Sequence, residues 1–315
     1  MFSGRSTSVV IINYLSNYAT LGHLVDSVKP GGKLTNTIAE IGIHVINGKK
    51  KRGATRWVMP LYITTFLQSQ QICASAVKHA LTKSENNLNH RQLVLFPVLQ
   101  RLVSSDIQSG HYFLIVLNLR NNRFEVLDSM RTLENEALAQ CCNTITSGIK
   151  QLWKIYYAQT LCYTDTAQTT KQIENNETVQ IPVPKQTNNH DCGFHMLMHA
   201  QHWDGRLVCE LHEKDIPNIR KILAHTWLSY EENDVDWESI LNAEYALWQR
   251  LQKWFYNTGP NYSVSASVFW GEDLLFFSSH FFSGDDDGTA CGSMWLLEPR
   301  CWGLGGGEEL QMIAA

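Results

Sequence analysis

Hydrophobic residues along the chain form two kinds of pattern, which predict strands in some segments and helices in others. Nearly continuous apolar runs at 93–98 and 111–119 are typical of buried strands. Apolar residues recur every three or four positions at 133–157 and 192–203, as they do on one face of a helix. The segment 58–67 fits either a strand or a helix.

Shorter segments predict further elements. Helices are expected at 23–28, 35–46, 72–81, 219–228 and 237–256, short extended pieces at 9–12 and 179–184, and a surface loop at 162–180. Pro30-Gly31-Gly32 is a turn that separates a weakly patterned lead, residues 1–30, from a domain at 31–256. Residues 257–315 show no sustained period, so we expect a disordered tail there.

Two of the predicted strands form a hairpin. The apolar run that opens at His111 is broken at Asn121-Asn122, and a second strand follows that ends at Asp128. Folding the hairpin brings His111 and Asp128 to one end of the sheet. A two-residue turn at Asn121-Asn122 would pair Asp128 with Ile115, about 13 Å short of His111. We therefore expect a bulge, a longer loop or a strand offset there.

A polar, turn-rich stretch ends at Cys192, where an apolar segment begins. Met196, Ala200 and Trp203 recur at helical spacing, and Gly205 is a stop signal. At the first turn of such a helix, unpaired backbone N–H groups and the helix dipole favour a thiolate, which is the reactive form of cysteine. A buried structural cysteine that caps a core helix is the alternative that this stretch alone leaves open.

Composition narrows the class of protein. The chain is 44% hydrophobic, which is enough for a sizeable core, and its formal charge of −4 predicts no general affinity for nucleic acid. Its eight cysteines include no Cys-x-x-Cys pair, which argues against a disulfide framework and fits a reducing compartment. No apolar run reaches the roughly 18 residues of a membrane span.

The cysteine usage predicts a location in the nucleus or the cytoplasm. The basic cluster Lys49-Lys50-Lys51-Arg52 fits a nuclear-import signal and slightly favours the nucleus, while a solvated loop explains it as well. No feature of the sequence predicts an oligomeric state.

The order His111, Asp128, Gln186, Cys192 carries a resemblance when it is taken with its flanks. His-Tyr-Phe-Leu-Ile-Val, Val-Leu-Asp-Ser-Met and Gln-Thr-Asn-Asn-His-Asp-Cys-Gly resemble motifs of the ubiquitin-like-protein-specific cysteine proteases, the SUMO-processing (sentrin-specific) family. The resemblance covers about 32–227 and is closest to copies found in plant transposable elements. It implies an α+β, papain-like fold with a mixed central sheet packed by helices and the cysteine at a helix N-terminus.

The resemblance also implies a reaction and a partner. Cys192 would be the nucleophile, His111 its base and acid, and Asp128 the group that orients His111. Gln186 would donate to the developing oxyanion together with the Cys192 backbone N–H. The expected substrate is the bond after the C-terminal Gly-Gly of a ubiquitin-like modifier, SUMO first, either free or in its conjugates. Members of the family need no cofactor or metal.

Three further residues are implied to contact the substrate. Tyr112 would flank the Gly-Gly tail where the family usually has Trp, and Gly193 would let the backbone come close beside the nucleophile. Lys33 stands where the family usually has a second Trp that roofs the channel. A lysine covers a glycine tail less well than an indole does, so we expect weaker substrate grip.

Two alternatives stay open at this point. The first is a metal site, because histidines cluster around the cysteine, at positions His190, His195, His199 and His202. The second is a transposon-derived protein that binds a modifier but is catalytically weak or inactive.

Overall fold

The computed structural model describes residues 6–14, 17–49, 55–72, 74–82, 88, 91–101, 110–158, 172–208, 210–243, 262–270, 274–283 and 293–299, the last three as backbone only. The chain divides into two compact units, Met1–Val235 and Asp236–Ala315. The candidate site residues all lie in the first unit.

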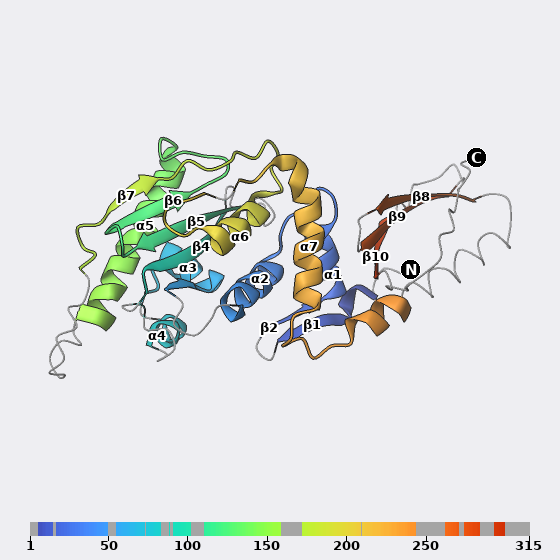
Figure 1. Ribbon diagram of the computed structural model, residues 1–315, viewed down its shortest axis with the longest axis horizontal. Coiled ribbons are helices and arrows are strands. Elements are labelled where there is room, and N and C mark those ends of the chain that lie inside the picture. Colours follow the sequence, from blue (N-terminus) through green and yellow to red (C-terminus); the bar gives the residue numbers. More distant parts are fainter. Residues whose placement is uncertain are drawn as a thin grey trace. The chain divides into compact units, whose positions relative to one another are not determined.

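The first unit is built on a five-stranded mixed sheet (Figure 1). Its strands, in sheet order, are β3 (Arg56–Val58), β4 (Leu93–Arg101), β5 (Gly110–Asn118), β6 (Arg123–Leu127) and β7 (Glu177–Gln180). The central pairs β4–β5 and β5–β6 are antiparallel, whereas β3 and β7 run parallel to their neighbours. Every residue of β5 after Gly110 is buried, as its continuous apolar run predicts.

Helices pack against the sheet and against one another. The helices of the first unit are α1 (Leu21–Val28), α2 (Asn36–Gly48), α3 (Leu61–Gln68), α4 (Ser75–Thr82), α5 (Glu136–Trp153), α6 (Cys192–His202) and α7 (Ile216–Leu228). Helix α6 packs against β5 and also contacts α2 and α7. The segment 58–67, which fits either type of element, divides between them, because β3 ends at Val58 and Pro60 precedes α3.

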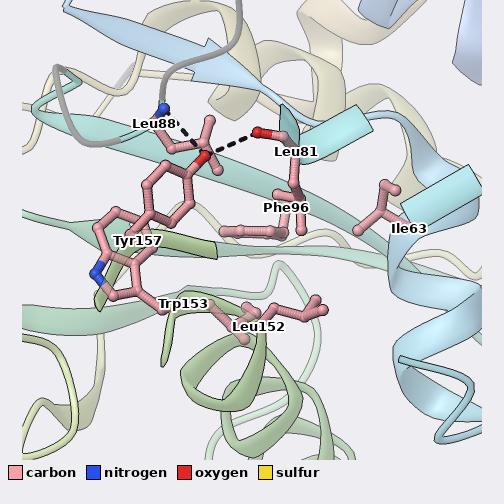
Figure 2. Close-up of a pocket in the computed structure, with 8 residues that line it drawn as sticks. Ile63, Leu81, Leu88, Phe96, Leu152, Trp153 and Tyr157 are labelled. Carbon is pink, nitrogen blue, oxygen red and sulfur yellow. Dashed lines mark hydrogen bonds between the residues drawn. The ribbon is translucent and has the colours of Figure 1, made fainter. Parts of the chain in front are cut away.

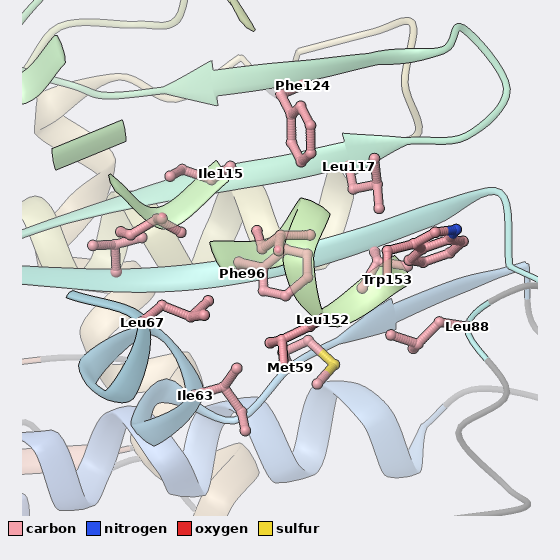
Figure 3. Packing of buried hydrophobic residues seen from close by; sticks show 14 of the residues in the cluster. Met59, Ile63, Leu67, Leu88, Phe96, Ile115, Leu117, Phe124, Leu152 and Trp153 are labelled. Carbon is pink, nitrogen blue, oxygen red and sulfur yellow. The ribbon is translucent and has the colours of Figure 1, made fainter. Parts of the chain in front are cut away.

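A hydrophobic cluster of buried residues joins the sheet to α3, α4 and α5. Figure 3 shows part of it. Alternate residues of β5, Phe113, Ile115 and Leu117, belong to it, as the period of two in a strand requires. A cavity of about 10 Å³ remains beside Trp153 and Tyr157 (Figure 2). Its lining is apolar and its volume is at the lower limit for a single water, so it is a packing gap in the core.

The β5–β6 hairpin has a longer loop than two residues. Asn118 pairs with Arg123, so four residues, Leu119 to Asn122, connect the strands. Asn122 adopts a left-handed conformation with φ 50°, which asparagine tolerates better than most residues. The expected longer loop is confirmed. It shifts the pairing so that Leu127 lies opposite Leu114, which brings Asp128 two residues closer to His111.

The N-terminal residues belong to the same compact unit as the sheet. Strands β1 (Val10–Tyr14) and β2 (Asn17–Thr20) form a two-stranded ribbon, and the Tyr14 hydroxyl donates to the Trp227 carbonyl of α7. The compact unit therefore includes residues before 31. These elements are short, which is why their sequence pattern is weak.

The second unit contains a three-stranded antiparallel sheet of β8 (Tyr262–Trp270), β9 (Leu274–Ser283) and β10 (Ser293–Pro299), with β9 in the middle. The disordered tail at 257–315 stays a prediction. The helix expected at 237–256 is described as helical at 237–243, and its remainder lies outside the described residues, as does most of the loop expected at 162–180.

Candidate active site

Four buried side chains come together from four places in the fold. His111 is the second residue of β5, Asp128 directly follows β6, Gln186 lies in the loop before α6, and Cys192 is the first residue of α6. Their exposed fractions are 1%, 0%, 8% and 3%, respectively. Buried polar groups need partners, so the contacts of each residue show what holds the site together.

The Asp128 carboxylate holds the His111 ring. His111 Nε2 lies 2.8 Å from Asp128 Oδ1, and the carboxylate can only accept, so Nε2 donates. The same oxygen also accepts from the backbone N–H groups of Met130 and Arg131, at 2.8 and 2.9 Å. Asp128 is therefore fixed by its own turn as well as by His111.

The contact between His111 and Asp128 shifts the pKa of each side chain. Burial lowers the pKa of His111, but hydrogen bonds to Asp128 and Cys192, together with their negative charges, outweigh that effect and raise it. Burial raises the pKa of Asp128, but its contacts with His111 and Arg131 outweigh that effect and lower it. Asp128 is thus kept ionised while Nδ1 of His111 is left for the thiol.

Cys192 occupies the first turn of α6. The Asp191 carbonyl accepts from Phe194 N at 2.9 Å and from His195 N at 3.1 Å. Asp191 is therefore the N-cap, and Cys192 is the first residue of the helix. The backbone N–H groups of Cys192 and Gly193 precede these first intrahelical donors, so they are available to an anion beside the sulfur. The other described cysteines, Cys141 and Cys142, have pKa values raised by burial to about 11 and 12.

The contacts of Gln186 determine which way its carboxamide points. Its Nε2 donates to the Asn188 carbonyl at 2.7 Å, and its Oε1 accepts from the Ser129 hydroxyl at 2.5 Å. A carbonyl can only accept, so the amide group must face Asn188. One N–H of Gln186 remains for another acceptor. Ser129, the residue after Asp128, thus links the oxyanion candidate to the His111–Asp128 pair.

Two side chains pack closely against the backbone of Gly193. A Cβ added to Gly193 would lie 2.5 Å from Cβ of Leu34 and 3.2 Å from Cδ2 of Tyr112. Any side chain at this position would therefore displace Leu34. The Tyr112 hydroxyl donates to Asn36 Oδ1 at 2.9 Å, which fixes the ring beside the nucleophile.

Lys33 is exposed, whereas Leu34 is buried with an exposed fraction of 4%. Sequence reasoning missed Leu34. The sequence feature that could have identified Leu34 is its place directly before Thr35. Thr35 is the N-cap of α2, and its side chain accepts from Ile38 N. A hydrophobic residue at this position commonly fixes the direction in which the chain enters a helix.

A buried ion pair anchors the start of α6. Arg220 of α7 pairs with Asp191, donates to the Ser27 carbonyl at 2.7 Å and stacks over the Phe194 ring with its guanidinium carbon 4.1 Å from the centroid. Removing one partner of such a pair typically costs about 3–5 kcal/mol, because the other charge stays buried. Sequence reasoning missed this pair, which joins residues far apart in the chain.

Two of the histidines that follow Cys192 on α6, His195 and His199, are buried, whereas His202 is exposed. Both ring nitrogens of His195 and Nε2 of His199 are buried without a hydrogen-bond partner in the described part of the chain. Burial lowers the pKa of both residues, to about 3 for His199. Among the described residues, no three His, Cys, Asp or Glu side chains are grouped so that they could hold a metal ion. Across the same residues, no helix is long and apolar enough to cross a membrane.

The fold is α+β, with a mixed central sheet packed by helices and a His–Asp pair beside a cysteine at a helix N-terminus. The model of the Ulp1 protease family, C-terminal catalytic domain, matches residues 68–232. The chain belongs to this family.

Solved structures show the same fold. The yeast Ulp1 protease domain in complex with Smt3, the yeast orthologue of SUMO, is 15% identical with a TM-score of 0.54, over 71% of this chain and 89% of that chain. The SUMO protease Ulp1 with its catalytic cysteine oxidised to a sulfinic acid is 16% identical with a TM-score of 0.55, over 72% and 90%. No curated protein matches the chain.

Proposed function

We propose that this protein is a cysteine peptidase that cleaves after the C-terminal Gly-Gly of a ubiquitin-like modifier, with SUMO as the first candidate. The observation that carries the proposal is the buried His111–Asp128 hydrogen bond of 2.8 Å beside Cys192 at the start of α6. Membership of the Ulp1 protease family supports the class of reaction.

The first half of the reaction forms an acyl-enzyme. The Cys192 thiol gives its proton to Nδ1 of His111, and the sulfur attacks the carbonyl carbon of the scissile amide or isopeptide. The carbonyl electrons move onto oxygen, and the Cys192 backbone N–H and the free Gln186 N–H donate to this oxyanion. The intermediate collapses as His111 protonates the departing amine, leaving a thioester on Cys192.

The second half releases the modifier. His111 takes a proton from water, and the hydroxide attacks the thioester carbonyl. The C–S bond then breaks, and the thiolate recovers its proton from His111. Asp128 stays ionised throughout and holds the ring through Nε2, so Nδ1 always faces the sulfur.

The packing around Gly193 requires a glycine beside the nucleophile. Leu34 and Tyr112 approach the backbone at Gly193 closely enough to exclude a Cβ there. Lys33 is exposed next to Leu34, and it is the residue that we align with the roofing Trp of related proteases.

We also propose the finer features that the sequence suggests. The protein would be of the plant transposon-associated type, to which its motifs are most similar. It would act in the nucleus or cytoplasm, with a catalytic domain at 31–256 and residues 257–315 outside it.

A panel of modifiers that carry a C-terminal electrophile tests the proposed function. SUMO, ubiquitin and other ubiquitin-like modifiers are each incubated with the full chain, and the adduct is located by peptide mapping. A covalent adduct on Cys192 with at least one modifier is expected. Binding without an adduct would instead support the catalytically inactive, modifier-binding alternative.

A further inference from the structure

Arg131 contacts the oxygen of Asp128 that His111 does not use. Its Nε donates to Asp128 Oδ2 at 3.1 Å, and its Nη2 lies 3.1 Å from the same oxygen. The Arg131 side chain is 13% exposed and the Asp128 side chain is fully buried. The carboxylate is therefore held between two cationic groups, the His111 ring on Oδ1 and the guanidinium on Oδ2.

Gln100 holds Arg131 in turn. Arg131 Nη1 donates to Gln100 Oε1 at 2.9 Å, and Gln100 Nε2 donates to the Ala137 carbonyl in α5 at 3.0 Å. Gln100 lies directly opposite His111 in the β4–β5 pairing. The guanidinium also lies over the Phe113 ring, with its central carbon 5.5 Å from the centroid. Arg131 is thus held by Gln100 of β4 and Phe113 of β5, the strand that carries His111.

Several charged or titratable groups surround the His111–Asp128 pair. Asp128 and Arg131 follow β6, Cys192 and His195 come from α6, and Lys185 donates to the Asp128 carbonyl at 3.1 Å. Among these groups, Arg131 contacts Oδ2 of the carboxylate itself, while the His111 ring contacts Oδ1. Its positive charge offsets part of the attraction between Asp128 and an imidazolium on His111. Removing that charge would favour the imidazolium and keep it protonated to higher pH.

We propose that Arg131, held by Gln100, is a positioning residue that aims Asp128 at His111 and sets the upper pH limit of the thiolate–imidazolium pair. The proposal rests on the proposed function, because it assigns the pair a catalytic role. Arg131 acts through Asp128 and touches neither substrate nor sulfur. A purely structural arginine would affect folding without moving the pH at which the imidazolium loses its proton.

The test measures alkylation of Cys192 by chloroacetate across pH, which requires no modifier. This anionic reagent reacts fastest while His111 is an imidazolium, so the rate falls as that proton is lost. Arg131→Gln is expected to move the midpoint of this fall upward by about one pH unit, because the charge is lost while the backbone N–H groups of Met130 and Arg131 still hold Asp128 against His111. Arg131→Lys keeps the charge and is expected to hold the midpoint at the wild-type value. Cys192→Ser gives the background rate, and thermal melting monitors folding.

Cleavage of a modifier supplies the second readout. Arg131→Gln is expected to lower kcat about tenfold with little change in KM, since a hydrogen bond to a charged group is lost away from the substrate. Gln100→Leu keeps the Arg131 charge while freeing its side chain, and is expected to lower kcat several-fold. This variant carries the test if Arg131→Gln does not fold.

The outcomes separate the two proposals. A wild-type chain that cleaves no modifier, but whose alkylation midpoint moves in Arg131→Gln, contradicts the proposed function and supports the role of Arg131. A wild-type midpoint together with a wild-type kcat in Arg131→Gln overturns the role of Arg131. If only Gln100→Leu folds, a wild-type kcat in that variant overturns it. An equal shift of the midpoint in Arg131→Lys and Arg131→Gln also overturns it, because the charge would then not matter.

Discussion

His111 and Asp128 meet diagonally across the β5–β6 hairpin, with His111 Nε2 2.8 Å from Asp128 Oδ1. Leu114 pairs with Leu127, so continuing the register places Asp128 opposite Phe113, two residues short of His111. The side chains span this offset. Diagonal neighbours on a sheet lie about 7–8 Å apart, which an imidazole and a carboxylate can bridge.

Replacing Asp128 by Asn tests the charge in this contact. Asp128→Asn keeps the shape but removes the negative charge that raises the pKa of His111, so the alkaline limb of kcat/KM should move to lower pH. The rate itself should fall by about 10²–10⁴-fold, because the ring loses its orientation and its partner. Steady-state cleavage over a pH series measures both.

Asp26→Asn is the matched control, since Asp26 is exposed and paired only with Lys29 in the described contacts. It should leave the profile unchanged. An alkaline limb that stays at the wild-type pH in Asp128→Asn would show that Asp128 does not act on His111.

Ser129→Ala tests how Gln186 is oriented. The variant removes the hydroxyl that donates to Gln186 Oε1 at 2.5 Å, which frees the carboxamide to turn its oxygen toward the substrate. We expect kcat to fall about tenfold with KM nearly unchanged, because the lost interaction is made in the transition state. In a Gln186→Ala background the same change should have no further effect.

The double-mutant cycle is the decisive part of this measurement. Additive losses in Ser129→Ala and Gln186→Ala would mean that Ser129 does not act through Gln186. Ser69→Ala, an exposed serine after α3, serves as the control and should behave like the wild type.

Lys33→Trp tests the roof of the substrate channel. An indole next to Leu34 would cover a Gly-Gly tail by stacking, which the lysine stem does less well. The contact would be made equally in the ground and transition states, so KM should fall more than kcat rises. Lys78→Trp on α4 is the control. Unchanged kinetics in Lys33→Trp would remove Lys33 from the channel.

The buried histidines of α6 predict an acid-sensitive fold. Burial lowers the pKa of His199 to about 3, whereas an unfolded histidine titrates near 6.5. Between these values the unfolded chain binds the extra proton, so stability is complete above about pH 6.5 and falls as the pH drops. His199 alone should cost about 2 kcal/mol between pH 7 and pH 5.

Denaturant unfolding at the two pH values measures this loss. His199→Phe should lose less stability on acidification than the wild type, while His225→Phe, at an exposed position of α7, should lose as much. An equal loss in His199→Phe and the wild type would show that His199 is not buried in its neutral form.

Local signals in the sequence predicted the elements that carry the site. The spacing of Met196 and Ala200 placed a helix directly after the polar loop, and α6 begins at Cys192. The apolar runs at 93–98 and 111–119 predicted β4 and β5. The pattern also showed that a two-residue turn could not bring Asp128 to His111, and the four-residue loop resolves this.

Contacts between distant residues could not be predicted from local patterns. Arg220 reaches Asp191 and the Ser27 carbonyl, which lie on separate elements, and no periodicity records such a pairing. Leu34 looked like an ordinary apolar residue before a helix, and only the fold brings it against Gly193. The role of Arg131 likewise depends on a strand register that places Gln100 opposite His111.

The central claim is that Cys192 is a nucleophile activated by His111, and one labelling experiment tests it most directly. SUMO with a C-terminal electrophile is incubated with the wild type, Cys192→Ser and His111→Ala, and adducts are quantified by mass spectrometry. We predict a single adduct on Cys192 in the wild type, none in Cys192→Ser and a greatly slowed reaction in His111→Ala. An adduct on Cys141 or Cys142, or equal rates in the wild type and His111→Ala, would contradict the account.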